Sequence, residues 1–100
     1  APLLIPWGRL KQMTVAGVYR DIHYLYGSKF MVGREEGEKV FPDDEFMSRK
    51  HLVFSLVDGK AQVQDLGSSN GTFVRIRNQV FLNGGDMLRV GDQLLRFELG

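Results

Sequence analysis

Residues 52–65 of this 100-residue chain read LVFSLVDGKAQVQD, and this stretch decides the expected fold. In its first half every second residue from Leu52 is a large apolar one, which places these side chains on one face of a strand. Asp58 and Gly59 follow, a pair that favours the two-residue turn of an antiparallel hairpin. After the turn, apolar residues alternate with glutamines, as in a half-buried partner strand. The stretch therefore predicts a β-hairpin with one apolar face.

The rest of the chain repeats this pattern of short alternating runs separated by turn residues. Twelve glycines punctuate the sequence, and no long segment carries the apolar stripe of a helix. Residues 42–45 suit either one helical turn or a loop, and we expect a loop. Many short strands with regular turns indicate an all-β fold, an antiparallel β-sandwich or barrel. The runs expected to form strands are 8–15, 18–26, 30–32, 52–57, 60–64, 72–76 and 95–99.

Composition describes an ordinary small domain. The length suffices for one domain with one modest core, so we expect residues 1–100 to form a single domain. The first residue is alanine and not methionine, from which we expect a domain cut from a longer protein. A net charge of +1 gives no reason to expect a nucleic-acid or membrane surface. The absence of cysteine excludes disulfides and thiolate metal sites, and it favours a cytoplasmic location, with the nucleus as the alternative.

The loop after the hairpin, residues 65–72, has the composition of a tight turn that is rich in hydrogen bonds. It reads DLGSSNGT, with two glycines, two serines and an asparagine. Leu66 breaks the alternation of the preceding strand, which predicts a bulge or bend there. The loop also fits the hydrolase pattern G-x-S-x-G and the glycosylation pattern N-x-T. Both matches are weak, because no helix pattern follows the serine and nothing signals secretion.

Two other places in the chain combine a strand end with polar side chains. Gly33 and Arg34 end one apolar run, and residues 48–51, which read SRKH, precede another. A sandwich collects its loops at its ends, so these residues can meet the loop at 65–72. Arginine offers a planar donor fork that suits phosphate or carboxylate, and serine hydroxyls add further donors. The pattern therefore favours a local anion site.

Gly33-Arg34, then residues 48–51, then residues 65–72 together resemble the forkhead-associated (FHA) domain family in order and spacing. Residues 84–92, GGDMLRVGD, also look like the closing turns of that family. The resemblance covers nearly the whole chain. It implies a twisted antiparallel β-sandwich that binds phosphothreonine peptides through loops at one end.

The resemblance also implies roles for individual residues. Arg34 and Ser48 would hold the phosphate, and Asn70 would hydrogen-bond the main chain of the peptide. The full set of phosphopeptide-binding residues implied is Arg34, Ser48, Arg49, Ser69 and Asn70. A second set would brace the loops or set their geometry: Gly33, His51, Gly71 and Thr72.

The loops beside the expected pocket depart from the family pattern in two ways. They carry an unusual number of acids, namely Glu35, Glu36, Glu38, Asp43, Asp44 and Glu45. These acids could weaken a dianionic ligand or favour a peptide with basic flanks. The run of acids at 43–45 lacks the alternating ligands and glycine of a calcium loop, so no metal is expected. The segment 75–80 is longer than the family's usual turn there.

Our interpretation is a phosphothreonine-dependent adaptor domain that is not an enzyme and needs no cofactor. Its partner would be a protein or peptide that contains phosphothreonine, with no role for nucleic acid or membrane. One alternative keeps the fold but binds an unphosphorylated partner as a scaffold. A weaker alternative is a small serine hydrolase that uses Ser69 and His51. The sequence leaves the oligomeric state open.

Overall fold

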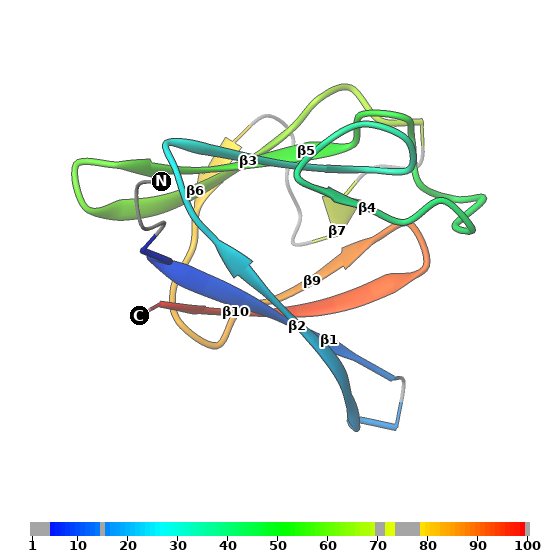
Figure 1. Cartoon of the computed structure of the whole chain (residues 1–100), viewed down its shortest axis with the longest axis horizontal. Helices are drawn as coiled ribbons and strands as arrows, with labels where there is room; N and C mark the ends of the chain where they lie inside the picture. The colour runs from blue at the N-terminus through cyan, green and yellow to red at the C-terminus, as the bar shows by residue number, and fades with distance from the viewer. Residues whose placement is uncertain (1–4, 15, 70–71, 74–78, 100) are drawn as a thin grey trace.

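The computed structural model describes residues 5–14, 16–69, 72–73 and 79–99, and in this part of the chain it contains strands and no helix. The strands form two five-stranded sheets that face each other (Figure 1). In chain order they are β1 (Gly8–Met13), β2 (Tyr19–Leu25), β3 (Lys29–Gly33), β4 (Lys39–Val40), β5 (Leu52–Val57), β6 (Lys60–Asp65), β7 (Thr72–Phe73), β8 (Gln79–Phe81), β9 (Met87–Val90) and β10 (Gln93–Leu99).

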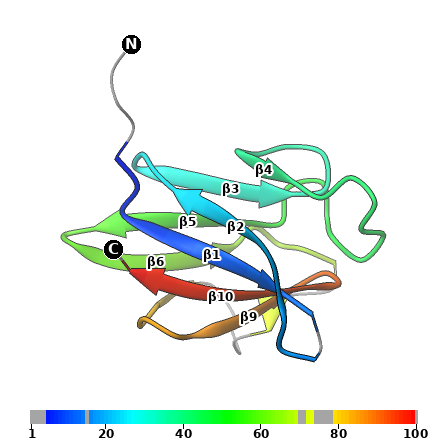
Figure 2. The same ribbon diagram turned by 60° about the horizontal axis from the view of Figure 1, so that its bottom comes forward.

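One sheet has the strand order β2-β1-β10-β9-β7 and the other has the order β4-β3-β5-β6-β8. Neighbouring strands are antiparallel except for the short pair of β3 and β4, which is parallel. Figure 2, in which the first sheet turns towards the viewer, shows the two layers and the crossing of their strands. The all-β sandwich expected from the alternating runs is confirmed.

The hairpin of β5 and β6 forms as predicted. Its register runs without a shift from Leu52 opposite Asp65 to Val57 opposite Lys60. Asp58 and Gly59 have φ angles of 50° and 77°, and two successive positive φ angles are what the favoured hairpin turn requires.

The end of β6 decides between the bulge and the bend that the sequence left open. No extra residue bulges out of the ladder near Leu66, because β6 ends at Asp65 and Leu66 leaves the sheet. The Leu66 amide donates to the carbonyl of His51, and the chain then bends at Gly67, whose φ is 78°. The bend predicted as the alternative to a bulge is therefore what breaks the alternation. Residues 42–45 form a loop, as expected.

The core lies between the facing surfaces of the two sheets. Phe54 of one sheet and Phe97 of the other are fully buried, and Met47 adds a buried side chain from the loop before β5. Alternating residues of β3, β5, β6 and β10 contribute to this core, which is the physical cause of the period-two pattern. Leu56 and Leu99 depart from the expected pattern, since both lie at or near the end of their strands and are exposed. In the described residues no helix is long and apolar enough to cross a membrane.

The strand register fixes where the polar loops lie. Val32 of β3 pairs with Leu52 of β5, and Leu52 pairs in turn with Asp65 of β6. The segments that follow Val32, precede Leu52 and follow Asp65 are therefore neighbours at one end of the sandwich, at the right of Figure 1. The hairpin turn at 58–59 lies at the opposite end.

We predict that Phe54→Ala lowers the free energy of unfolding by about 3–5 kcal/mol, because it empties a fully buried aromatic site. Phe81→Ala is the matched control, since Phe81 lies in β8 and is 57% exposed. Urea denaturation of both variants measures the difference. Equal losses for the two phenylalanines would contradict this account of the core.

Candidate functional site

Three loop segments meet at the end of the sandwich that the register defines. They are residues 33–36 after β3, residues 48–51 before β5 and residues 66–69 after β6. Backbone hydrogen bonds join them: the Arg34 amide donates to the Ser48 carbonyl at 2.9 Å, and the Leu66 amide donates to the His51 carbonyl at 2.9 Å. The site is thus built on strand ends, which place its side chains more rigidly than a long free loop would.

Arg34 is the cation that follows β3, in the loop whose backbone contacts Ser48. Its side chain is half buried, and its Nε atom is buried with no hydrogen-bond acceptor among the residues that the structure describes. A buried donor without an acceptor is costly, and more so when it carries charge. An anion placed at this edge of the guanidinium would remove that cost. The predicted role of Arg34 as a phosphate ligand would supply such an acceptor, and it stays a prediction.

Ser48 lies beside Arg34 and connects two of the loops. Its hydroxyl oxygen accepts a hydrogen bond from the Ser69 amide at 3.1 Å. A serine oxygen that accepts in this way keeps its own hydrogen for donation. The hydroxyl is therefore held in place by the protein while it can still donate to a bound group.

His51 supports Ser48 from the interior. Its side chain is fully buried, and its Nδ1 accepts the Ser48 amide at 3.1 Å. Acceptance at Nδ1 requires that this atom carry no proton, so in the neutral ring the proton is assigned to Nε2, which faces the Asp65 carboxylate at 3.8 Å. The expected bracing role of His51 agrees with this geometry, in which Nδ1 is committed to the loop backbone.

Asp65 organises the third loop by capping its backbone. One carboxylate oxygen accepts the amides of Gly67 and Ser68 at 2.9 and 2.8 Å, and the other accepts the Ser68 hydroxyl at 2.7 Å. The sequence analysis did not assign this role, although an aspartate two residues before a glycine is a common signal for such a turn. The cap presents the Ser69 amide to Ser48.

Arg49 forms the exposed rim of the site. Its guanidinium lies 3.0 Å from a Glu35 carboxylate oxygen and 3.4 Å from one of Glu36, and its side chain is 67% exposed. Lys50 approaches Glu36 at 4.0 Å. Exposed pairs of this kind contribute little to stability, but they neutralise the charge that Arg49 would offer a ligand. The flanking acids thus act on Arg49, while Arg34 is left to supply charge.

Gly33 is required by a close backbone approach. A Cβ atom at this position would overlap the Arg49 carbonyl oxygen and would lie 2.7 Å from that of Glu36. The Arg49 carbonyl uses this space to accept the amides of Glu35 and Glu36 at 3.2 and 3.1 Å. The absence of a side chain at Gly33 therefore lets the first two loops interlock.

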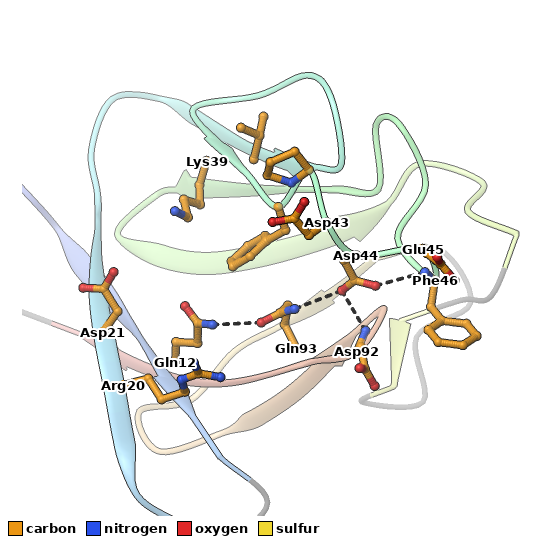
Figure 3. A pocket seen from close by; sticks show the side chains of 13 residues that line it. Gln12, Arg20, Asp21, Lys39, Asp43, Asp44, Glu45, Phe46, Asp92 and Gln93 are labelled. Atoms are coloured by element: carbon orange, nitrogen blue, oxygen red, sulfur yellow. Dashed lines mark hydrogen bonds between the residues drawn. The ribbon is translucent and has the colours of Figure 1, made fainter.

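The surface near these loops is hollowed in two places. A hollow of about 430 Å³ is lined by Glu36, Ser48, Arg49 and Lys50. A larger cavity of about 610 Å³ opens beside the loop before β5, between that loop, β1, β2 and the start of β10 (Figure 3). The sequence analysis did not predict the larger cavity, because its walls come from segments that are far apart in the chain.

The structure brings together Arg34, Ser48, Arg49 and Ser69 of the predicted binding residues, with Gly33 and His51 behind them. Asn70 and Gly71 lie outside the described residues, as do residues 75–78 of the long segment 75–80. Thr72 begins β7, but its side chain is likewise outside the description. The assignments for these residues stay predictions.

Comparison with known proteins places this geometry in a family. The sequence model of the FHA domain matches residues 30–91, the segment that carries all three loops. The chain belongs to the FHA domain family. The all-β fold and the family expected from the sequence are thereby confirmed. Because the family consists of protein-binding modules, this FHA domain is a binding module and not an enzyme, which removes the hydrolase alternative.

Relatives of the FHA domain are found among bacterial regulators. The chain is 39% identical over 70 residues to an oxoglutarate dehydrogenase inhibitor of Corynebacterium efficiens, an alignment that covers 68% of this chain and 49% of that protein. It is 36% identical over 83 residues to the glycogen accumulation regulator GarA of Mycolicibacterium smegmatis, covering 74% of this chain and 52% of that protein. The chain thus spans about half the length of these relatives.

Solved structures include a similar domain in a larger protein. EmbR of Mycobacterium tuberculosis, solved in complex with a low-affinity phosphopeptide, superposes with a TM-score of 0.82 at 28% identity. The match covers 95% of this chain and 25% of that chain.

We predict that His51→Ala lowers both the melting temperature and the affinity for a ligand at this site. The substitution leaves a buried cavity and an amide of Ser48 without its acceptor, which we expect to cost about 2–4 kcal/mol. Calorimetric unfolding measures the first effect, and titration at a temperature where the variant stays folded measures the second. A variant with unchanged melting temperature but lost binding would place His51 in contact with the ligand instead.

Proposed function

We propose that this FHA domain is a phosphothreonine-dependent adaptor that binds a phosphorylated protein or peptide at the end of the sandwich formed by residues 33–36, 48–51 and 66–69. The observation that carries the proposal is the buried Nε of Arg34, which lacks an acceptor among the described residues and lies in the loop joined to Ser48. Membership of the FHA family and the likeness to phosphopeptide-bound EmbR support it.

The proposed ligand chemistry follows from the available donors. A phosphothreonine carries about −1.5 to −2 charges at neutral pH and three strong acceptor oxygens. Arg34 supplies a charged fork and Ser48 a hydroxyl, and both would contact the phosphate. Ser69 would contact phosphate or peptide, and Asn70 would hydrogen-bond the peptide main chain. Arg49, already paired with two glutamates, would shape the rim.

Acidic side chains around the pocket indicate which residues the ligand should carry beside its phosphothreonine. Glu35 and Glu36 stay partly exposed although they pair with Arg49. Negative charge beside a phosphate pocket disfavours acidic residues next to the phosphothreonine and favours basic ones. We therefore propose a partner with basic residues near its phosphorylated threonine.

We also propose that the domain is part of a longer cytoplasmic protein. The relatives are regulators about twice the length of the aligned segment, which supports an adaptor domain within a longer protein. A cytoplasmic kinase and phosphatase would then control occupancy of the site. The partner would be a protein, with no requirement for a cofactor.

We predict that Arg34→Ala abolishes detectable phosphopeptide binding while the domain stays folded. The loss of a partly buried, charge-assisted contact should cost about 2–5 kcal/mol. Arg34→Lys should restore binding only in part, because an ammonium group cannot reproduce the planar fork. Isothermal titration calorimetry with a phosphothreonine peptide, selected from an oriented library, measures each variant.

Lys29→Ala is the matched control for charge, since Lys29 is exposed at the other end of the same strand β3. It removes one positive charge as Arg34→Ala does, but we expect its affinity to match the wild type. Unchanged affinity in a folded Arg34→Ala protein would exclude Arg34 as the phosphate ligand.

We also predict an order of affinity for four versions of one peptide: phosphothreonine above phosphoserine, with glutamate and unmodified threonine undetectable. The threonine methyl contributes roughly 0.8 kcal/mol if it becomes buried, and glutamate has one charge and planar geometry. Binding should weaken as the pH falls below about 6, where the phosphate becomes a monoanion. Fluorescence anisotropy measures all four. Equal affinity for the phosphorylated and unmodified threonine peptides would favour a phosphate-independent scaffold.

A further inference from the structure

Asp44 is a buried carboxylate in the loop between β4 and β5, the loop that also contains Ser48. Asp44 is only 5% exposed, which is rare for an aspartate unless its oxygens are well paired. Figure 3 shows Asp44 at one side of the large cavity, directed across it towards the opposite sheet. It belongs to an acidic run, residues 43–45, in which both neighbours are exposed.

Three hydrogen bonds hold the carboxylate, and they reach both sheets. One oxygen accepts the amide of Phe46, in its own loop, at 2.9 Å. The other accepts the amide of Asp92 at 2.8 Å and the side-chain amide of Gln93 at 3.1 Å. The last two residues belong to the turn between β9 and β10 and to the start of β10, in the opposite sheet. One carboxylate therefore ties the loop before β5 to the other layer.

The turn is shaped to admit this carboxylate. Gly91 has a φ of 58°, and a Cβ atom there would lie 2.7 Å from the Asp44 carboxylate oxygen. On the loop side, the Asp44 amide donates to the Phe41 carbonyl at 3.1 Å, and the Met47 amide donates to the Asp44 carbonyl at 3.3 Å. Met47 is buried in the core and directly precedes Ser48. Asp44 and Met47 together leave the backbone at Ser48 little freedom.

The carboxylate also sets the direction of a chain of hydrogen bonds along the cavity. An aspartate anion only accepts, so Gln93 must donate to it through its amide nitrogen. The Gln93 oxygen then accepts from the Gln12 amide nitrogen at 2.9 Å, and the Gln12 oxygen faces His23 Nε2 at 3.0 Å. His23 must therefore carry its proton on Nε2 to complete the chain. Burial is the main cause that lowers the pKa of His23, and the charge of Lys39 lowers it further. The ring is therefore neutral at pH 7, and its hydrogen bonds determine which nitrogen carries the proton.

We propose that Asp44 is a positioning residue for the phosphate pocket: it fixes the loop that contains Ser48 against the opposite sheet. Its effect on ligand affinity rests on the proposed phosphopeptide function, whereas its effects on the loop and on His23 need no ligand. Asp44 acts through the backbone from Phe46 to Ser48.

Asp44→Asn is the sharpest test, because it keeps the shape and replaces one acceptor with a donor. If the nitrogen replaces the oxygen that faces Asp92 and Gln93, it meets two donors. We expect the affinity for a phosphothreonine peptide to fall by about tenfold at a temperature where the variant is fully folded. Asp86→Asn is the control, since that carboxylate accepts the Asn83 amide at 2.8 Å in the turn before β9, at the opposite end of the sandwich. Unchanged affinity in Asp44→Asn would overturn the proposal.

Two measurements without ligand separate this proposal from the proposed function. In Asp44→Asn, amide hydrogen exchange should accelerate at Ser48 and Ser69 and stay slow in the ladder of β1 and β10, whereas uniform acceleration or none would overturn the proposal. Nitrogen-15 NMR should show His23 protonated on Nε2 in the wild type; a wild-type proton on Nδ1 would contradict the chain of hydrogen bonds that starts at Asp44. If the side-chain nitrogen introduced by Asp44→Asn faces Gln93, the two glutamines reverse and the proton moves to Nδ1, and adding Gln93→Glu should restore Nε2 protonation.

A second variant keeps the test decisive if Asp44→Asn does not fold. Gln93→Leu removes one of the three hydrogen bonds and cuts the chain to His23, while both backbone contacts of Asp44 remain. We expect faster exchange at Ser48 and a mixture of His23 tautomers. Wild-type behaviour in both readouts would overturn the proposal. A wild-type domain that binds no phosphopeptide would contradict the proposed function. The hydrogen-exchange and tautomer results would still decide the role of Asp44.

Discussion

The hydrogen bond from the Ser48 amide to the buried Nδ1 of His51 is the contact on which the arrangement of the site depends. The backbone of the same histidine holds the other two loops, since its amide donates to the Val32 carbonyl at 3.0 Å and its carbonyl accepts the Leu66 amide at 2.9 Å. One fully buried residue therefore touches the end of β3, the start of β5 and the end of β6. Because the loops are hydrogen-bonded to a residue packed in the core, their side chains are held in fixed positions.

The loops satisfy most of their own polar groups, and this determines what remains for a ligand. Asp65 caps the turn after β6, Ser48 accepts the Ser69 amide, and acids at the rim neutralise Arg49. Among the described residues of these loops, the Nε of Arg34 is a buried side-chain donor without an acceptor, and the Ser48 hydroxyl can still donate. With a net charge of +1 for the chain, attraction of an anion must be local. The proposed site would therefore select its ligand by the geometry of a few donors and not by a broad basic surface.

The fold was predictable where the pattern is local, and unpredictable where distant segments meet. The hairpin at 52–65 follows from alternation and from Asp58-Gly59, whose backbone angles suit one type of turn. The parallel pairing of β4 has no such signal, because two residues cannot show a period. Burial of Asp44 was not predicted, because its partners Asp92 and Gln93 lie 48 and 49 residues away in the chain. The three site loops were indicated by polar residues at strand ends, but the role of Arg34 came from the resemblance, because residue type alone does not single out this arginine.

The most direct test of the account is the Nε–H resonance of Arg34 in proton–nitrogen NMR spectra recorded while a phosphothreonine peptide is added. A bound phosphate would give this buried donor its missing acceptor, so its signal should move strongly and saturate together with the amides of Ser48 and Ser69. The unphosphorylated peptide should leave it in place. A phosphopeptide that binds while the Arg34 signal stays unmoved would contradict the account.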